Sequence, residues 1–321
     1  AATEGAEGVD RILARFGTER AGMPMPTKPV ADYQAFHRHV LVDDLDGVKL
    51  ITIRRPQAMN ALDDRVTDEI LEVIERYEDT ADGFVIIGYG TRAFCAGADI
   101  GRFPEVLGNN EAAAGYAREC SRLLLHLDTM NKPVVAALNG LTLGGGFELA
   151  LRCHSMVALK TASLQFPEVN LGIAPGLGGM VVPYRRWPAG SAIFHDMLRT
   201  GSRLKAPQAL ELGMVNGLAG SVDELITMAV ARVRELKTRP ELPTGPVQIP
   251  PMNDVDGSKN LSAEVVGLIG QAIERGAAAE TWNQALEIGY EIFADSACTA
   301  AAQEGISCFL GRRRPDYTKT G

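Results

Sequence analysis

NGLTLGGGFELA, residues 139–150, is the stretch of sequence that decides the fold. It follows an apolar run, residues 133–138, that predicts a buried strand, and its glycine triplet precedes residues 147–151, which predict the start of a helix. Backbone N–H groups at the start of a helix form a binding site for negative charge. Glycine triplets also occur in turns that need only close packing, so the neighbouring segments must decide between an anion site and a plain turn.

Short apolar strands alternate with helices on the N-terminal side of this stretch. Residues 48–53 and 84–89 have the composition of strands, and residues 63–77 carry apolar side chains at helical spacing. This alternation predicts an α/β fold in which helices cover the sheets.

Beyond about residue 188 the pattern changes and helices take over. The clearest predicted helices are 206–212, 223–237, 262–275, 282–293 and 296–310. Proline-rich residues 240–251 predict either a linker or an ordered loop. We therefore expect an N-terminal appendage at residues 1–35, a core at residues 36–220 and a C-terminal helical region at residues 221–321.

The composition excludes several classes of protein. A net charge of −8 disfavours a general nucleic-acid or anionic-membrane binder. No apolar run reaches the roughly 18 residues of a membrane span, so we expect no membrane partner. The five cysteines form no CxxC pair, which favours free thiols in a reducing compartment such as the cytoplasm. His37 and His39 have no acidic or cysteine partner nearby in sequence, so we expect no metal site.

Two further segments carry chemistry, AFCAGADI at residues 93–100 and FPEVNLG at residues 166–172. Attack on the β-carbon of an acyl thioester makes the carbonyl oxygen enolate-like, and fixed donors must stabilise that charge. The glycine loop supplies one donor, and the turn at residues 96–98 is the candidate for the second.

Glu148 and Glu168 are the candidate acid and base. Glu148 lies one helical turn inside the glycine loop, and Glu168 follows a proline in an apolar loop. Two carboxylates beside one electrophile can take a proton from water and handle the proton at the α-carbon. Position alone also allows Glu148 to complement the helix dipole and Glu168 to face solvent.

The three segments together, in this order and spacing, resemble the enoyl-CoA hydratase/isomerase, or crotonase, family from about Val40 to about Gly220. RPQAMNAL at residues 55–62 also resembles the first coenzyme A-binding loop of that family. The resemblance implies an α/β fold with a crotonase-type ββα spiral core, followed by the C-terminal helical region.

The resemblance also implies roles for individual residues. It places the oxyanion-hole amides at Ala98 and Gly145, the acid/base pair at Glu148 and Glu168, and a backbone group that helps to hold the attacking water at Gly176. The positions that it implies for substrate or coenzyme A binding are Arg55, Ala58, Ala61, Ala96, Asp99, Ile100, Phe309 and Arg312.

The presence of both glutamates favours a hydratase over the double-bond isomerases of this family, which typically keep only the second. Coenzyme A is then part of the substrate, and we expect neither a metal nor a redox cofactor. The resemblance implies an acyl-CoA thioester as ligand and a homotrimer or dimer of trimers as assembly. The region from Leu261 resembles the hydratase part of fused 3-hydroxyacyl-CoA dehydrogenase/enoyl-CoA hydratase proteins, so a fused or associated dehydrogenase is a further expected partner.

Three departures from the family pattern bear on specificity. Gln57 stands where the family often has lysine, so a phosphate contact is missing or is supplied by a neighbouring arginine. His154 replaces a common aspartate, and we expect a structural role for it because the helix should direct it away from the pocket. Residues 180–184, MVVPY, stand where the family usually has a run similar to Thr-Gln-Arg-Leu, and we expect this difference to alter the pocket wall.

Three functions are compatible with the sequence. The first is a hydratase of short-chain 2-enoyl-CoA thioesters, with crotonyl-CoA favoured. The second is a crotonase-fold hydratase or hydrolase of a cyclic dienoyl- or oxo-acyl-CoA, which the altered residues 180–184 allow. The third is a non-catalytic acyl-CoA- or RNA-binding relative, which the two glutamates and the acidic net charge disfavour.

Overall fold

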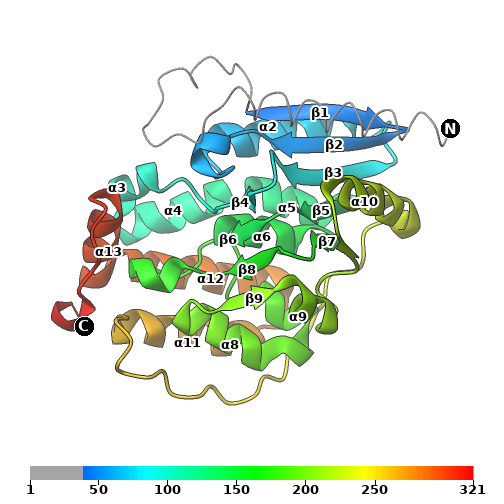
Figure 1. Ribbon diagram of the computed structural model, residues 1–321. Coiled ribbons are helices and arrows are strands. Elements are labelled where there is room, and N and C mark those ends of the chain that lie inside the picture. Colours follow the sequence, from blue (N-terminus) through cyan, green and yellow to red (C-terminus); the bar gives the residue numbers. More distant parts are fainter. Residues whose placement is uncertain (1–38, 321) are drawn as a thin grey trace.

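Two β-sheets form the centre of residues 39–320, the part of the chain that the computed structural model describes (Figure 1). The expected appendage at residues 1–35 and His37 lie outside the described residues. The strands are β1 (Val40–Leu45), β2 (Val48–Ile53), β3 (Gly83–Gly88), β4 (Ala93–Cys95), β5 (Val134–Leu138), β6 (Leu141–Leu143), β7 (Ser155–Leu159), β8 (Ser163–Gln165), β9 (Arg203–Lys205) and β10 (Leu218–Ala219). The first sheet has the order β1-β2-β3-β5-β7-β10 and the second the order β4-β6-β8-β9.

The chain moves back and forth between the two sheets. The pairs β3/β4, β5/β6 and β7/β8 each place one strand in the first sheet and the next in the second. β2, β3, β5, β7 and β10 run parallel, whereas β1 and β9 join their sheets antiparallel. Helices α3 (Phe103–Val106), α4 (Asn110–Cys120) and α5 (Arg122–Thr129) follow the first pair, and α6 (Gly145–Arg152) follows the second. This arrangement confirms the predicted α/β class and ββα spiral.

Burial explains why β2, β3 and β5 of the first sheet could be predicted from the sequence, whereas β1, β7 and β10 were not predicted. Every residue of β3, β5 and β7 is buried, so each strand appears as an uninterrupted apolar or small-residue run. Helix α2 (Asp64–Tyr77) is instead amphipathic: it begins at Asp63, whose side chain accepts a hydrogen bond from Val66 N, and it buries Val66, Ile70 and Ile74.

A side-chain clamp holds the ends of β3 and β5 together next to the site. Asn139, fully buried after β5, accepts a hydrogen bond from Gly88 N at 3.0 Å and donates to Gly88 O at 2.6 Å and Gly90 O at 2.7 Å. A Cβ at Gly88 would lie 2.2 Å from Phe94 O, so only glycine permits this close approach of β3 to β4. The clamp fixes where β4 begins and therefore where the turn at residues 96–98 lies.

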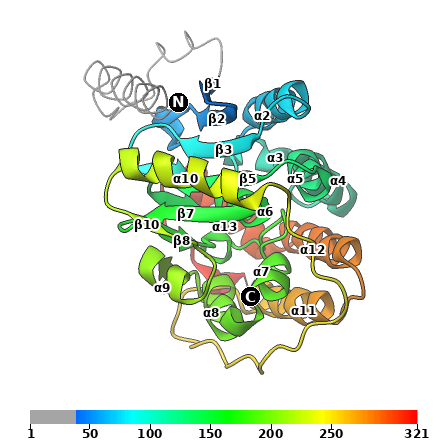
Figure 2. The same ribbon diagram turned by 90° about the vertical axis from the view of Figure 1, so that its right-hand side faces the viewer.

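The region after residue 188 contains more strand than the sequence pattern showed. After α7 (Val182–Arg186), it contributes β9 and β10 besides α8 (Ser191–Thr200), α9 (Ala206–Glu211) and α10 (Val222–Leu236). These strands have three and two residues, too few to show an alternating pattern. Helix α10 packs against β3, β5 and β7 of the first sheet, although it begins just after the boundary expected at residue 220 (Figure 2).

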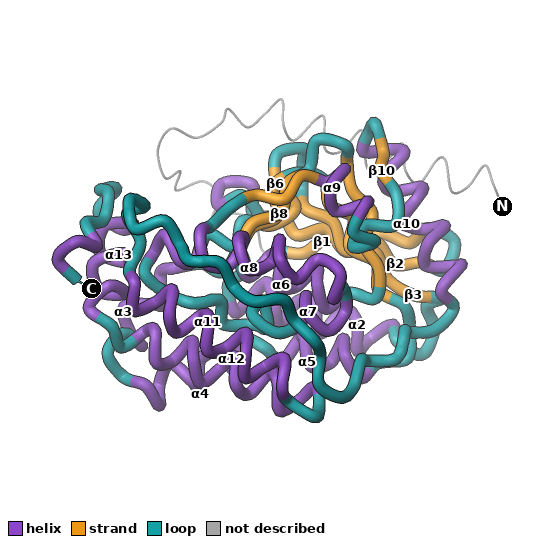
Figure 3. Tube along the Cα trace, turned by 90° about the horizontal axis from the view of Figure 1, so that it is seen from below, coloured by secondary structure: helices purple, strands orange, loops and turns teal. Residues whose placement is uncertain are grey.

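Residues 237–262 form an ordered loop, the second of the two structures expected for the proline-rich segment. Arg185 donates to Gly245 O, Arg199 donates to Asn253 O, and Val247 N donates to Ala277 O. Figure 3 shows this loop crossing the face formed by α7, α8 and the C-terminal helices.

Three helices complete the described chain: α11 (Ala263–Ala278), α12 (Trp282–Ala297) and α13 (Ala300–Leu310). Helix α12 packs on α4, and α13 packs on the short η4 helix (Glu168–Leu171). The break between α12 and α13 lies at residues 298–299 and not at residues 294–295 as expected, because Thr299 caps α13 by accepting a hydrogen bond from Ala302 N.

Asn139→Ala tests the clamp. The substitution leaves a buried N–H and two buried carbonyl groups without their partner, so we expect it to lower the free energy of unfolding by about 2–4 kcal/mol. Urea denaturation followed by circular dichroism measures the change. Asn131→Ala, at an exposed position, is the matched control, and an equal effect of the two substitutions would contradict the structural role of Asn139.

Candidate active site

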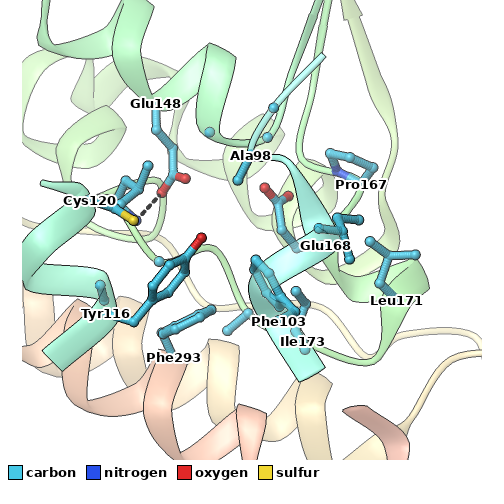
Figure 4. Close-up of a pocket in the computed structure, with 18 of the residues that line it drawn as sticks. Ala98, Phe103, Tyr116, Cys120, Glu148, Pro167, Glu168, Leu171, Ile173 and Phe293 are labelled. Carbon is cyan, nitrogen blue, oxygen red and sulfur yellow. Dashed lines mark hydrogen bonds between the residues drawn. The ribbon is translucent and has the colours of Figure 1, made fainter. Parts of the chain in front are cut away.

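A cavity of about 80 Å³ lies where the two sheets meet the C-terminal helices. It is lined by the turn at residues 96–98, the glycine loop, both predicted glutamates, and side chains from α3, α4 and α12. Figure 4 shows the carboxylates of Glu148 and Glu168 directed into this cavity above the rings of Phe103, Tyr116 and Phe293. Most of the lining is apolar, so the two carboxylates are its principal charged groups.

The amides of Ala98 and Gly145 come together at one side of the cavity. Leu62 forms a parallel bridge with Ala98 that uses the amides of Leu62 and Asp99 and leaves the Ala98 amide outside it. Gly145 is the first residue of α6, where helix N–H groups have no acceptor within the helix. A Cβ at Gly145 would lie 3.2 Å from Ala98 N, so the two backbone segments are close enough to present donors to one oxygen.

Glu148 is buried and held by backbone. Its Oε1 accepts hydrogen bonds from Leu177 N and Gly179 N, both at 2.7 Å. Burial raises the pKa of this carboxyl to about 7, although the two amides and the nearby Arg152 favour the ionised form. Glu148 therefore does not simply complement the helix dipole, because its side chain points into the cavity and binds the loop opposite.

Glu168 is the first residue of η4 and lies on the other side of the cavity. Its carboxyl group has fewer hydrogen-bond partners than that of Glu148. Its Oε2 is buried and has no hydrogen-bond partner in the described part of the chain. Burial, followed by the negative charge of Glu148, raises its pKa well above the usual range. A Cβ at Gly144 would lie 2.4 Å from Glu168 Oε1, so glycine at that position leaves room for the carboxylate.

The far wall of the cavity is aromatic, and the sequence motifs did not indicate it. Phe103 of α3 meets Tyr116 of α4 edge-on at 5.8 Å and Phe293 of α12 edge-on at 6.0 Å between ring centres. Leu171, Ile173 and Cys120 fill the space around these rings. Each residue lies on the apolar stripe of its helix or in an apolar loop, so only the tertiary structure separates it from ordinary core.

The remaining residues implied by the family resemblance fall in several places. Ala96 and Ile100 line the cavity, as does Gly176, which lies against the Phe293 ring. Arg55 is turned inward, donating to Ala61 O at 2.9 Å and to Asp99 Oδ2 at 2.8 Å. These bonds tie the loop after β2 to the turn after β4.

Like Arg55, Ala61 and Asp99, three more of the residues implied for substrate or coenzyme A binding lie outside the cavity. Ala58 ends the short η2 helix (Pro56–Ala58) and is half-buried. Phe309, with an exposed fraction of 52%, lies near the end of α13, and Arg312 is exposed just beyond it. Their proposed role in binding stays a prediction.

The expectation that residues 180–184 form part of the pocket wall is wrong. None of these five residues is among the described residues that line the cavity. Val181 packs against Gly276 of α11, and the Tyr184 hydroxyl lies 3.0 Å from His195 Nδ1. Residues 180–184 therefore pack against the C-terminal helices and the long loop, and they do not line the cavity.

His154 has the structural role expected of it. Its Nδ1 accepts a hydrogen bond from Val134 N, and its Nε2 lies 2.9 Å from Leu127 O. Burial lowers its pKa to about 4, so the ring is neutral at pH 7.

Residues 39–320 contain neither a candidate metal site nor a candidate membrane-spanning helix. No cluster of three or more His, Cys, Asp or Glu side chains in that range is placed to hold a metal ion. Nor does any helix in that range have the length and apolar character to cross a bilayer.

Comparison with known proteins agrees with the geometry. Residues 44–245 match the family model described as enoyl-CoA hydratase/isomerase. The chain is 31% identical over 277 residues to a "probable enoyl-CoA hydratase" of Bacillus subtilis (strain 168), covering 84% of this chain and 95% of that protein. It is 34% identical over 180 residues to the "short-chain-enoyl-CoA hydratase" of Clostridium acetobutylicum, covering 56% of this chain and 67% of that protein. A solved structure of an enoyl-CoA hydratase from Rhodobacter sphaeroides 2.4.1 has a TM-score of 0.70 at 21% identity, covering 87% of this chain and 91% of that one, which shows the shared fold.

Glu168→Gln tests the environment of the second carboxyl. Because the pKa of Glu168 is raised in the folded protein, the unfolded chain binds fewer protons above about pH 4.5, and native stability falls as the pH rises from there. Glutamine cannot ionise, so we expect the stability of the variant relative to the unmodified protein to increase between pH 5 and pH 8, by at most about 1.4 kcal/mol per pH unit. Denaturation at several pH values measures it. Glu75→Gln, exposed on α2, is the control, and a pH-independent difference for Glu168→Gln would contradict the raised pKa.

Proposed function

This chain belongs to the enoyl-CoA hydratase/isomerase family, and we propose that it catalyses the reversible addition of water to a short-chain 2-enoyl-CoA thioester, with crotonyl-CoA as the favoured substrate. The observation that carries the proposal is the placement of two carboxylates and two converging backbone amides around one small apolar cavity. The reaction needs no group beyond these residues, water and the thioester, so we propose no metal or redox cofactor.

The amides of Ala98 and Gly145 are proposed to hold the thioester oxygen. When water attacks the β-carbon, the electrons of the double bond move towards the carbonyl and place negative charge on that oxygen. Fixed backbone donors stabilise this charge without reorganisation, and the start of α6 adds the positive end of a helix dipole.

The hydrogen bonding of the two carboxylates supports a different proposed role for each. Glu148 accepts two amide hydrogen bonds, which favour its ionised form, so it is proposed to take the proton from the attacking water. Glu168 has an unpartnered oxygen beside the charge of Glu148, which favours its protonated form, so it is proposed to donate its proton to the α-carbon. At the end of the addition the two protonation states have exchanged, and water can return the proton.

The size of the cavity supports a short acyl group. A protein cavity of about 150 Å³ holds a benzene molecule, whereas this one has about 80 Å³. The volume therefore favours a short linear chain over the cyclic dienoyl- or oxo-acyl group of the second hypothesis. A purely binding protein would not need two buried carboxyl groups that both destabilise the fold at neutral pH, which disfavours the third.

Binding, assembly and location are proposed from the resemblance and the composition. We propose that Phe309 and Arg312 contact coenzyme A, and that the chain forms a trimer or a dimer of trimers. A fused or associated dehydrogenase would oxidise the 3-hydroxyacyl product. The five free cysteines support a reducing compartment such as the cytoplasm, and the acidic charge disfavours a nucleic-acid partner.

Glu148→Gln and Glu168→Gln test the acid/base pair. Each substitution keeps the size of the side chain but removes the proton transfer, so we expect kcat for crotonyl-CoA to fall by roughly 10²- to 10⁴-fold while KM changes little. Loss of the conjugated thioester absorbance measures hydration. In the unmodified enzyme kcat should also fall as the pH drops below about 7, because Glu148 is then protonated. Near-normal turnover of either variant would refute the two-carboxylate mechanism.

Phe293→Ala tests the limit on acyl length. The ring of Phe293 closes the cavity opposite the glutamates, so its removal should enlarge the acyl site. We expect the ratio of kcat/KM for hexenoyl-CoA to that for crotonyl-CoA to rise about tenfold or more, the range for one or two methylene groups in a hydrophobic pocket. Leu310→Ala, exposed on α13, is the control, and an unchanged ratio for Phe293→Ala would place the acyl chain elsewhere.

A further inference from the structure

A buried ion pair lies directly behind the candidate base. Arg152 is one turn after Glu148 on α6, and its Nε donates to Asp128 Oδ1 of α5 at 2.8 Å while Nη2 donates to Oδ2. The two side chains have exposed fractions of 0% and 4%. A buried pair of this kind usually adds little stability over apolar residues of the same size, so its placement calls for another explanation.

Arg152 also holds the loop that binds Glu148. Its remaining nitrogen, Nη1, donates to Leu177 O at 3.3 Å, and Leu177 N donates to Glu148 Oε1 at 2.7 Å. Leu177 is therefore fixed on both sides, by the cation through its carbonyl and by the carboxylate through its amide. Gly179, two residues later, supplies the second amide to the same carboxylate oxygen.

The ion pair is completed by the C-terminal helices. Trp282, the first residue of α12, donates from Nε1 to Asp128 Oδ2 at 2.7 Å, and its ring centre lies 5.8 Å from the Arg152 guanidinium. About two turns further along the helix Tyr290 is also buried, and burial raises the pKa of its hydroxyl although Ser121 and Arg152 act to lower it. Helix α12 thus contributes to the polar cluster behind Glu148 as well as to the aromatic wall in front of it.

We propose that Arg152 is a positioning residue which, held by Asp128 and Trp282, fixes the loop at residues 177–179, so that Glu148 has its catalytic geometry only when α12 is docked. This inference rests on the proposed hydratase function. It assigns α12 a role in the chemistry that is separate from closing the acyl cavity.

Several charged or titratable groups surround Glu148 and determine whether its pKa should rise or fall in each variant. They are Arg152 on its own helix, Asp128 on α5, Tyr116 and Cys120 on α4, Glu168 on η4 and Tyr290 on α12. The cation of Arg152 favours the ionised form of Glu148, and Asp128 offsets part of that effect. Removing Asp128 should therefore lower the pKa of Glu148, whereas removing the Arg152 charge should raise it.

The first experiment measures protonation directly, without turnover. The carboxyl ¹³C resonance of Glu148, assigned with Glu148→Gln, is titrated in the unmodified protein, Asp128→Asn and Arg152→Met. We expect the Glu148 pKa to move by about one unit or more, downwards in Asp128→Asn and upwards in Arg152→Met. Should either single variant fail to fold, Arg152→Met/Asp128→Asn removes both charges and is expected to raise the pKa. Unchanged titration in every folded variant would overturn the proposal.

The second experiment separates positioning from packing. Arg152→Lys keeps the charge but cannot reach Asp128 and Leu177 O together, and Trp282→Phe removes only the indole donor. For both we expect kcat for crotonyl-CoA to fall about 10- to 100-fold with KM unchanged. Ile269→Val, buried in α11, is the control for general loosening of the C-terminal helices and should leave kcat near normal. Equal effects of Trp282→Phe and Ile269→Val would overturn the proposal.

The two experiments distinguish this inference from the function on which it rests. Opposite shifts of the Glu148 pKa in a protein that hydrates no enoyl-CoA would contradict the proposed function and leave the network intact. An active hydratase in which the Glu148 pKa is the same with and without the charges of Arg152 and Asp128 would contradict this inference and leave the proposed function intact.

Discussion

The close contact between the end of β3 and β4, next to the side chain of Asn139, is the constraint on which the site depends. Because a Cβ at Gly88 would lie 2.2 Å from Phe94 O, the two sheets can approach this closely only through backbone. Asn139, just after β5, supplies three hydrogen bonds to the backbone of Gly88 and Gly90, beyond the last residue pair of β3 and β5. β4 and β6 then run side by side, which brings the Ala98 amide next to Gly145. The proposed oxyanion hole is thus a consequence of how the two sheets are joined.

The two carboxyl groups differ because their surroundings differ, and not because of their chemical type. Both lie at an apolar cavity, so burial raises both pKa values. Glu148 receives two amide hydrogen bonds from the loop opposite, and its charge then disfavours ionisation of Glu168. Glu168 Oε2 is left buried without a partner, a state that destabilises the fold and that proteins retain mainly at functional sites.

The central part of the fold and the chemical residues could be predicted because both depend on local backbone requirements. Buried parallel strands appear as apolar runs, and the glycine loop, the turn at residues 96–98 and the Pro167-Glu168 loop each need particular residues at fixed spacing. The aromatic wall could not be predicted in the same way. Phe103, Tyr116 and Phe293 come from three separate helices and meet only through tertiary packing. The prediction for residues 180–184 is wrong for the converse reason, because these residues are close to a motif in sequence but do not line the cavity.

Helix α12 shows how one stripe of side chains can couple the size of the acyl site to the geometry of the base. Trp282, Leu286, Tyr290 and Phe293 recur at intervals of four, four and three residues and so share one face of the helix. From one end of this face to the other, the contacts are Asp128, the loop at Gly178 and the cavity itself. Since Phe293 and Trp282 belong to one helix of 16 residues, an outward displacement of the whole helix that enlarged the acyl site at Phe293 would also move Trp282 away from Asp128. A longer acyl chain that pushed α12 outward would therefore meet a less well positioned Glu148, and chain length would be selected in kcat as well as in binding.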